Sequence, residues 1–225
     1  MDFAPKVISG IVLTDDLIRL PPNPDASASV TTTKIWRLCV PAAINHLVAN
    51  KHRDHLLGYD LDGASFRLPD LVKGVEVTDQ FGTSRDIEII RRDLLMVPSA
   101  VSLSGPVDPI ADPELDDFAC YRVRGARRPP TSPQVVIDDE FVAGLHLDVK
   151  QPMRLCLSAE RPPGHARLDP ADALMCYRTR PSVGFRSFRG PDSPVYVANS
   201  LPDADVLERV NHLRELCVPA VVTLP

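Results

Sequence analysis

Short apolar runs typical of β-strands follow one another along this chain. "DIEII" at Asp86 and "LHLDVK" at Leu145 alternate apolar and polar residues, the period of a strand with one buried face. "VEV", "VVI" and "VYV", at Val75, Val135 and Val195, have the β-branched and aromatic composition of a half-buried strand. The segments "DQFGTSR" and "DEFVAG" follow two of these runs and contain Asp and Gly, so we expect hairpin turns there.

Two segments have apolar residues at helical spacing: "AAINHLVANKHRDHL" at 42–56 and "DADVLERVNHL" at 203–213. We expect each to form a short helix, although the repeat described below places a strand in the second. Elsewhere the 23 prolines, about twice the usual share, disfavour helices and are tolerated at strand ends and in loops. The sequence therefore predicts an all-β fold with at most short helices.

Three sequence landmarks recur in a fixed order, which indicates an internal repeat. The first reads "HLLGYDLDG" at His55, "DFACYRVRG" at Asp117 and "ALMCYRTRP" at Ala173. The second, repeating at about 60 residues, reads "VEVTDQFG" at Val75, "VVIDDEFV" at Val135 and "VYVANSLP" at Val195. The third reads "RLCVPA" at Arg37, "LLMVPS" at Leu94, "RLCLSA" at Arg154 and "ELCVPA" at Glu215.

A degraded unit precedes these, because "MDFAPKVISG" aligns with "DFACYRVRG" and "IVLTDDL" with "VEVTDQF". We therefore expect four pseudo-repeats, with boundaries at 1–44, 45–101, 102–160 and 161–225. A unit of about 60 residues is marginal for independent folding. The units are expected to be sandwich-like or barrel-like and to share one continuous core.

Four of the five cysteines occupy paired positions in this repeat: Cys120 with Cys156, and Cys176 with Cys217. In the second unit both cysteines are absent together, at Gly58 and Met96. Paired retention and paired loss favour two disulfides over buried thiols, and such loops add roughly 3–4 kcal/mol of stability. Cys39 is left unpaired, since Pro5 holds its partner position. An inert core thiol, a bond to another copy and a reactive group all remain open for it.

The repeated Cys-Tyr pair is expected to have a structural meaning. Adjacent residues of a strand point to opposite faces, so the cysteine faces one layer and the tyrosine the other. The tyrosines concerned are Tyr59, Tyr121 and Tyr177.

The landmarks resemble an uncharacterised bacterial repeat domain, found mainly in exported proteins, with the pattern HLxCYxV, VxVxDQFG and LCxPA. The matches are "HLLGYDL", "VEVTDQFGTSRDIEI" and "RLCVPA", with looser later copies. The resemblance implies an extracellular or cell-surface location and no known enzymatic activity. The chain departs from the family in its missing cysteines and in "NSLP" where DQFG is expected. No export signal is visible, so a cytoplasmic or particle-associated location stays open.

Charge and motifs exclude several functions. The net charge of −5 disfavours nucleic acid as a partner, and no apolar run approaches the roughly 20 residues of a membrane span. GxSxG, HExxH and glycine-rich phosphate loops are absent from the sequence. We therefore expect no enzymatic activity and no cofactor.

The densest polar cluster contains the weak metal-ligand candidates His46, His52, His55, Asp60 and Asp62. Their spacing matches no zinc signature, and "DLDG" lacks the rest of a calcium loop, so surface or structural roles are favoured. The turn positions Asp15, Asp79, Asp139 and Asn199 align across the units. The acids among them are expected to accept backbone N–H bonds rather than to bind metal.

These features favour a non-catalytic structural or interaction protein: a surface, matrix, filament or shell component. It would self-associate through β edges or bind another surface protein. One alternative is a carbohydrate- or ligand-binding module that stacks its ligand on Trp36 and the tyrosines, although Trp36 precedes a core strand and is expected to pack inside. A second is a metal-dependent hydrolase using the His46–Asp62 segment.

Overall fold

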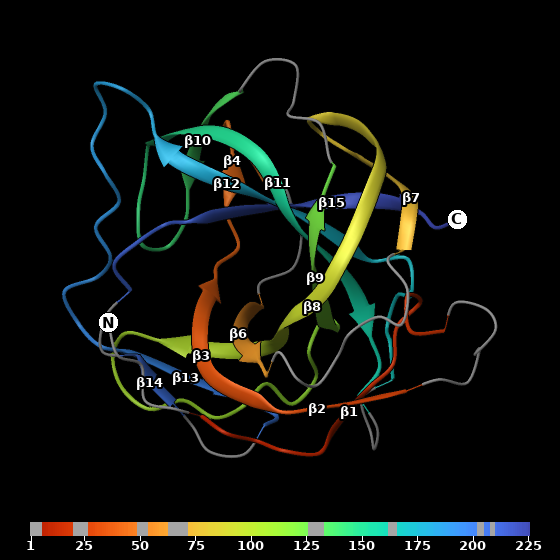
Figure 1. The fold of residues 1–225 in the computed structure, drawn as a ribbon. Helices are drawn as coiled ribbons and strands as arrows, with labels where there is room; N and C mark the ends of the chain where they lie inside the picture. The colour runs from red at the N-terminus through yellow and green to blue at the C-terminus, as the bar shows by residue number, and fades with distance from the viewer. Residues whose placement is uncertain are drawn as a thin grey trace.

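The computed structural model describes residues 6–19, 27–48, 54–62, 72–125, 133–161, 166–201, 205–207 and 210–225 (Figure 1). This part of the chain contains fifteen strands and no helix, which confirms the all-β prediction. It follows that no described helix is long and apolar enough to span a membrane.

The strands vary greatly in length. In chain order they are β1 Ile11–Leu13, β2 Ala28–Val30, β3 Thr32–Cys39, β4 Ala43–Ile44, β5 Leu47–Val48, β6 His55–Leu61, β7 Val72–Asp79, β8 Gly82–Ser102, β9 Asp117–Arg124, β10 Gln134–Asp138, β11 Leu145–Ala159, β12 Ala173–Pro181, β13 Val195–Asn199, β14 Asp205–Leu207 and β15 Glu215–Thr223. The two longest, β8 and β11, each have several partners along their length, so they connect different parts of the molecule.

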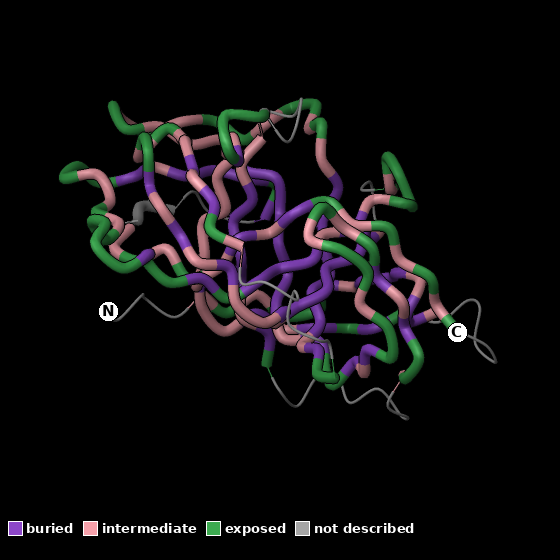
Figure 2. The backbone as a smooth tube through the Cα atoms, turned by 90° about the horizontal axis from the view of Figure 1, so that it is seen from above, coloured by how far each residue is buried: buried purple, intermediate pink, exposed green. Residues whose placement is uncertain are grey.

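Six strands pair in a closed cycle. β8 pairs with β7, β7 with β15, β15 with β12, β12 with β11, β11 with β9, and β9 again with β8, all antiparallel. The largest apolar core lies inside this ring and includes Val77, Ile89, Leu155, Met175 and Val218. Buried residues run along these strands through the interior, and exposed ones gather in the connections (Figure 2).

Five of these strands, β8, β9, β11, β12 and β15, form a wall with apolar residues on both faces. Its second face carries Leu94, Met96, Phe118 and the four paired cysteines. On β9, Phe118 and Cys120 face this cluster while Ala119 and Tyr121 face the ring interior. The expected opposition of cysteine and tyrosine is therefore confirmed. β6 and β3 extend the sheet beyond β8, and a separate apolar cluster lies behind them.

The hairpin predictions are correct, whereas the helix predictions are wrong in the described residues. β7 and β8 join through Asp79 and Gly82, and β10 pairs with β11. The first expected helix contains β4 and β5, joined at Asn45 and His46, whose positive φ angles of 52° and 63° suit a tight hairpin turn. The second contains β14. Pairing of β4 with β10 and of β14 with β13 satisfies the backbone and overrides the helical spacing.

The aligned turn positions share one geometry. Each side-chain oxygen accepts the backbone N–H two residues ahead: Asp15 from Leu17, Asp79 from Phe81, Asp139 from Phe141 and Asn199 from Leu201. This confirms that the turn acids accept backbone hydrogen bonds.

The landmark tyrosines contact these turns across the molecule. Tyr121 donates its hydroxyl hydrogen bond to Asp15 at 2.6 Å, Tyr177 donates to Asp79, and the Asn199 amide donates to Tyr59 at 2.9 Å. In terms of the four expected units, the Tyr121 contact joins units 3 and 1. The Tyr177 and Asn199 contacts both join units 4 and 2. Three strand pairs join the same units, since β7 pairs with β15, β13 with β8, and β10 with β4. The pairs β3–β6, β8–β9 and β11–β12 join adjacent units instead. The four-unit organisation stays a prediction, and these contacts are the structural observation in its favour.

One of these contacts includes a fully buried ion pair. Arg92 lies 3.3 Å from Asp15 and donates hydrogen bonds to the Tyr121 hydroxyl, and neither charged side chain is exposed. Burial raises the pKa of Asp15, although Arg92 and the hydrogen-bond donors around the carboxylate oppose this. Burial likewise raises the pKa of Tyr121. The cluster ties the first turn of the chain to the five-stranded wall.

Candidate functional site

A groove of about 360 Å³ lies between β3 and the segment 210–217, which includes the start of β15. Residues 35–42 line one side without interruption, and residues 210–217 line the other. Alternate side chains of a strand point to opposite faces, so consecutive residues can line one cavity only along the strand's edge. The groove therefore follows the edges of two chain segments rather than the face of a sheet.

The strand pairing agrees with this position. β3 pairs with β6, whereas β15 pairs with β12 and β7. Among the described residues no strand pairs with both β3 and β15, although the side chains of Arg37 and Glu215 meet at 3.0 Å. The groove thus occupies the position between these two strands.

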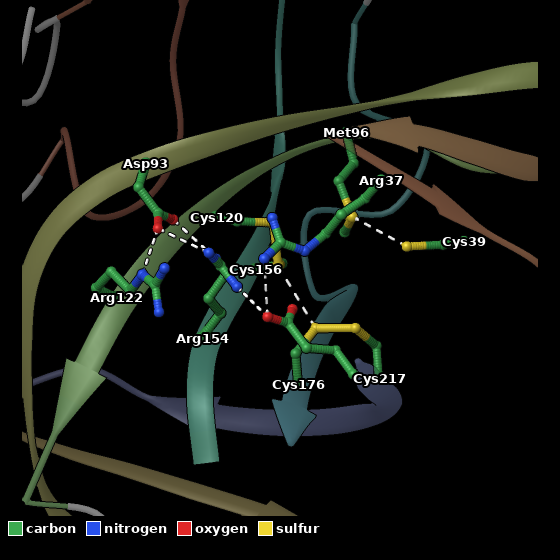
Figure 3. Close-up of a disulfide and its surroundings, with 11 residues drawn as sticks. Arg37, Cys39, Asp93, Met96, Cys120, Arg122, Arg154, Cys156, Cys176 and Cys217 are labelled. Atoms are coloured by element: carbon green, nitrogen blue, oxygen red, sulfur yellow. Dashed lines mark hydrogen bonds and ion pairs between the residues drawn. A yellow bond between two sulfur atoms is a disulfide. The ribbon is translucent and has the colours of Figure 1, made fainter. Parts of the chain in front are cut away.

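The floor between these edges is part of the sulfur-containing face of the wall, including Met96, Cys176 and Cys217 (Figure 3). Cys120 is bonded to Cys156 and Cys176 to Cys217, and each pair is directly opposed across two strands with a Cα–Cα distance of 3.9 Å. Both disulfides are those expected from the sequence. They fit folding in an oxidising environment.

The structure also explains the missing disulfide of the second unit. Gly58 and Met96 are opposed across β6 and β8 as the cysteine pairs are elsewhere. A Cβ atom on Gly58 would lie 3.1 Å from the Arg37 Cβ and 3.3 Å from Leu94 Cδ1. This is tighter than ordinary contact, so the approach of β3 favours glycine at this position.

A chain of charges closes one end of the floor. Arg154, whose side chain is 2% exposed, donates two hydrogen bonds of 2.9 Å to Asp93 and a third to Glu215. Glu215 also accepts a bond from Arg37, and Asp93 one from Arg122. Burial lowers the pKa of Arg37, and Glu215 opposes this. Within the described residues, the buried Nε and Nη1 of Arg37 have no hydrogen-bond acceptor.

Trp36 lies at the rim of the groove, contrary to the expectation that it packs in the core. The register of β3 and β6 shifts between Ile35 and Arg37, which makes Trp36 an irregular position. The side chain is partly buried, with Lys34 Nζ 4.1 Å and Arg214 Cζ 5.5 Å from its ring centroid. The landmark tyrosines are buried, so they are not available to stack on a ligand.

Cys39 lies on the groove wall as an unpaired thiol. Its Sγ is 3.7 Å from Met96 Sδ. Burial, with a smaller contribution from Glu215, raises the pKa of this thiol to about 11, so the unreactive protonated form predominates at neutral pH. Of the three possibilities for Cys39, the structure favours an inert thiol.

The metal-ligand candidates have separate partners. His46 pairs with Asp138 at 3.1 Å and His55 with Glu140 at 2.9 Å. Asp60 faces Lys34 and Arg37 at 3.9 Å, and Asp62 follows β6. His52 lies outside the described residues. No group of three metal-ligating side chains occurs in the part of the chain that the structure describes.

Comparison with known protein families, curated proteins and solved structures finds no match for this chain. The family resemblance stays an expectation from the sequence, and the function is argued from the groove.

Proposed function

We propose that this chain is a non-catalytic interaction module that takes an extended strand from a second copy into the groove between β3 and β15. Such strand addition gives affinity through backbone hydrogen bonds and specificity through side-chain pockets. The observation that carries the proposal is the uninterrupted lining of one cavity by two chain segments, 35–42 and 210–217, which include the end of β3 and the start of β15.

The order of strands in the sheet indicates what fits. Strands β6, β9 and β12 contain the first landmark, and each lies between two strands of the third: β6 between β3 and β8, β9 between β8 and β11, and β12 between β11 and β15. The groove lies between β3 and β15, the two ends of this alternating series. A first-landmark strand is therefore the matching occupant, and a second copy of the chain carries that sequence.

The groove chemistry suits such a strand. Its apolar floor, with Leu94, Phe118 and Leu174, matches the apolar alternation of the first landmark. Backbone carbonyls of an added strand supply the kind of acceptor that the buried Arg37 donors lack. The edge strands β5 and β14 offer fewer backbone groups to pair with an added strand, because β5 has two residues and β14 has three. An extracellular or cell-surface location, which the disulfides favour, fits this role.

Val40→Asp tests the proposal, with Val221→Asp as the matched control. Val40 lines the groove, whereas Val221 is 71% exposed at the far end of β15. Light scattering across a concentration series should show self-association of the wild type. Val40→Asp should weaken that association at least about tenfold, since an added strand would bury the new charge. Val221→Asp should leave it unchanged.

Far-UV circular dichroism and a count of alkylatable thiols would show that both variants keep the fold. A wild type that remains monomeric at every concentration would overturn the proposal, as would equal association of the two variants. A synthetic peptide of the β9 sequence, with serine for cysteine, should compete for the groove, and a scrambled peptide should not.

The position of Trp36 favours a second candidate, the binding of a carbohydrate or other small ligand. A partly buried indole beside two cations at the mouth of an apolar cavity is a common ligand-contacting arrangement. Glycan-array binding that Trp36→Ala abolishes would support this function. Binding that is absent, or unchanged by Trp36→Ala, would count against it.

A further inference from the structure

The two disulfides are in contact with each other. Cys156 Sγ lies 3.9 Å from Cys176 Sγ, although these atoms belong to different bonds (Figure 3). The two disulfides also differ in access: Cys176 and Cys217 line the groove, whereas Cys120 and Cys156 are fully buried. One disulfide is therefore open to small molecules, and the other is reached only through its neighbour.

We propose that the Cys176–Cys217 bond is a modification site for small neutral thiols, and that exchange there is passed on to the Cys120–Cys156 bond. An apolar cavity of about 360 Å³ admits a compact uncharged thiol more readily than a charged one, because desolvating a charge is costly.

The first step is attack on Cys217, which is partly exposed, whereas Cys176 is 1% exposed. The incoming thiol loses its proton to solvent, and the thiolate forms a mixed disulfide with Cys217 Sγ. The bond between Cys217 and Cys176 breaks, and its electron pair leaves on Cys176 Sγ.

The second step takes place inside the wall. The Cys176 thiolate attacks Cys156 Sγ, forming a Cys156–Cys176 bond and releasing Cys120 as a thiolate that takes up a proton. The two sulfurs must approach by about 2 Å to reach bonding distance. Apart from the unchanged Cys39 thiol, one thiol and two disulfides are present before and after, so no oxidant or reductant is consumed.

Two features favour transfer of the exchange from the Cys176–Cys217 bond to the Cys120–Cys156 bond. Cys156 and Cys176 lie on the directly paired strands β11 and β12, and their sulfurs are already in contact at 3.9 Å, so the thiolate is released beside its target. The Cys39 thiol does not compete as a nucleophile, because burial keeps it protonated.

The test treats native wild-type protein with one equivalent of 2-mercaptoethanol, followed by acid quenching, alkylation after unfolding, and peptide mapping by mass spectrometry. The expected products are a mercaptoethanol adduct on Cys217, a Cys156–Cys176 cross-link and a newly alkylated Cys120 beside Cys39. In a Cys120→Ala/Cys156→Ala variant the released thiol should stay on Cys176. The Cys39→Ala variant should react as the wild type does.

Other outcomes overturn the proposal. A new thiol on Cys176 or Cys217 in the wild type would show that exchange stops at the first disulfide. Absence of any adduct on the native protein would show that the groove does not admit the thiol.

Discussion

Removing one disulfide at a time is the sharpest test of what stabilises this fold. The Cys120–Cys156 bond closes a loop with a sequence separation of 36, and the Cys176–Cys217 bond one of 41. The chain-entropy model assigns about 4 kcal/mol to each loop. The loops do not overlap in sequence, so in this model their unfolded-state contributions sum to about 8 kcal/mol. Because the two disulfides touch, removing both should deviate from this sum through the packing that they share. A domain's total stability is on the order of 5–15 kcal/mol, so the fully reduced protein should be close to unfolding.

Urea unfolding followed by circular dichroism measures this effect. With a slope of roughly 3 kcal/mol per molar urea, each Cys→Ala pair should lower the midpoint by about 1.3 M. The single variant Cys39→Ala is the control, because it removes a thiol from the same cluster without removing a cross-link. Its cost should be about 1 kcal/mol.

Two results would refute this reasoning. If either paired variant unfolds at the same urea concentration as Cys39→Ala, the bridges add no stability beyond packing. If reduction of the wild type leaves the midpoint unchanged, the long-range strand pairing holds the fold by itself.

Three further predictions concern single side chains. Asp15→Ala should cost about 3–5 kcal/mol of unfolding free energy in urea, because Arg92 loses its buried partner. The control Asp16→Ala, at a partly exposed ion pair, should cost at most about 1 kcal/mol. Equal losses would contradict the burial argument. Gly58→Ala should lower stability by about 1–3 kcal/mol through crowding against Arg37, and a neutral result in thermal unfolding would refute this. Iodoacetamide should modify Cys39 about 100-fold more slowly in the folded than in the unfolded protein at pH 8, with the folded rate rising toward pH 11. Since the folded thiol pKa lies above the unfolded one, the contribution of Cys39 to stability is full below the unfolded pKa and is lost as pH rises toward 11.

The features predictable from sequence are those set by local chemistry. Strand composition, hairpin turns, turn acids and paired cysteines each depend on a few neighbouring residues or on comparison of aligned units. Trp36 was misplaced because an irregularity in β3 turns it away from the core, and irregular positions leave no clear mark in an apolar pattern. The helical spacing at 42–56 gave way to β4 and β5 because β10, distant in sequence, supplies a pairing partner. The groove itself arises from the separation of β3 and β15, which belong to distant parts of the sequence, and composition does not reveal it.

The long-range contacts have a consequence for how the units depend on each other. In a linear repeat protein each unit touches only its neighbours, and stability is nearly a sum over units. Here Tyr121 completes the turn of Asp15, Tyr177 that of Asp79, and Asn199 binds Tyr59, each pair lying two expected units apart. A fragment of two adjacent units would leave buried turn acids and tyrosine hydroxyls without their partners, at a cost of about 1–3 kcal/mol each. The chain therefore gains its stability as a whole rather than unit by unit.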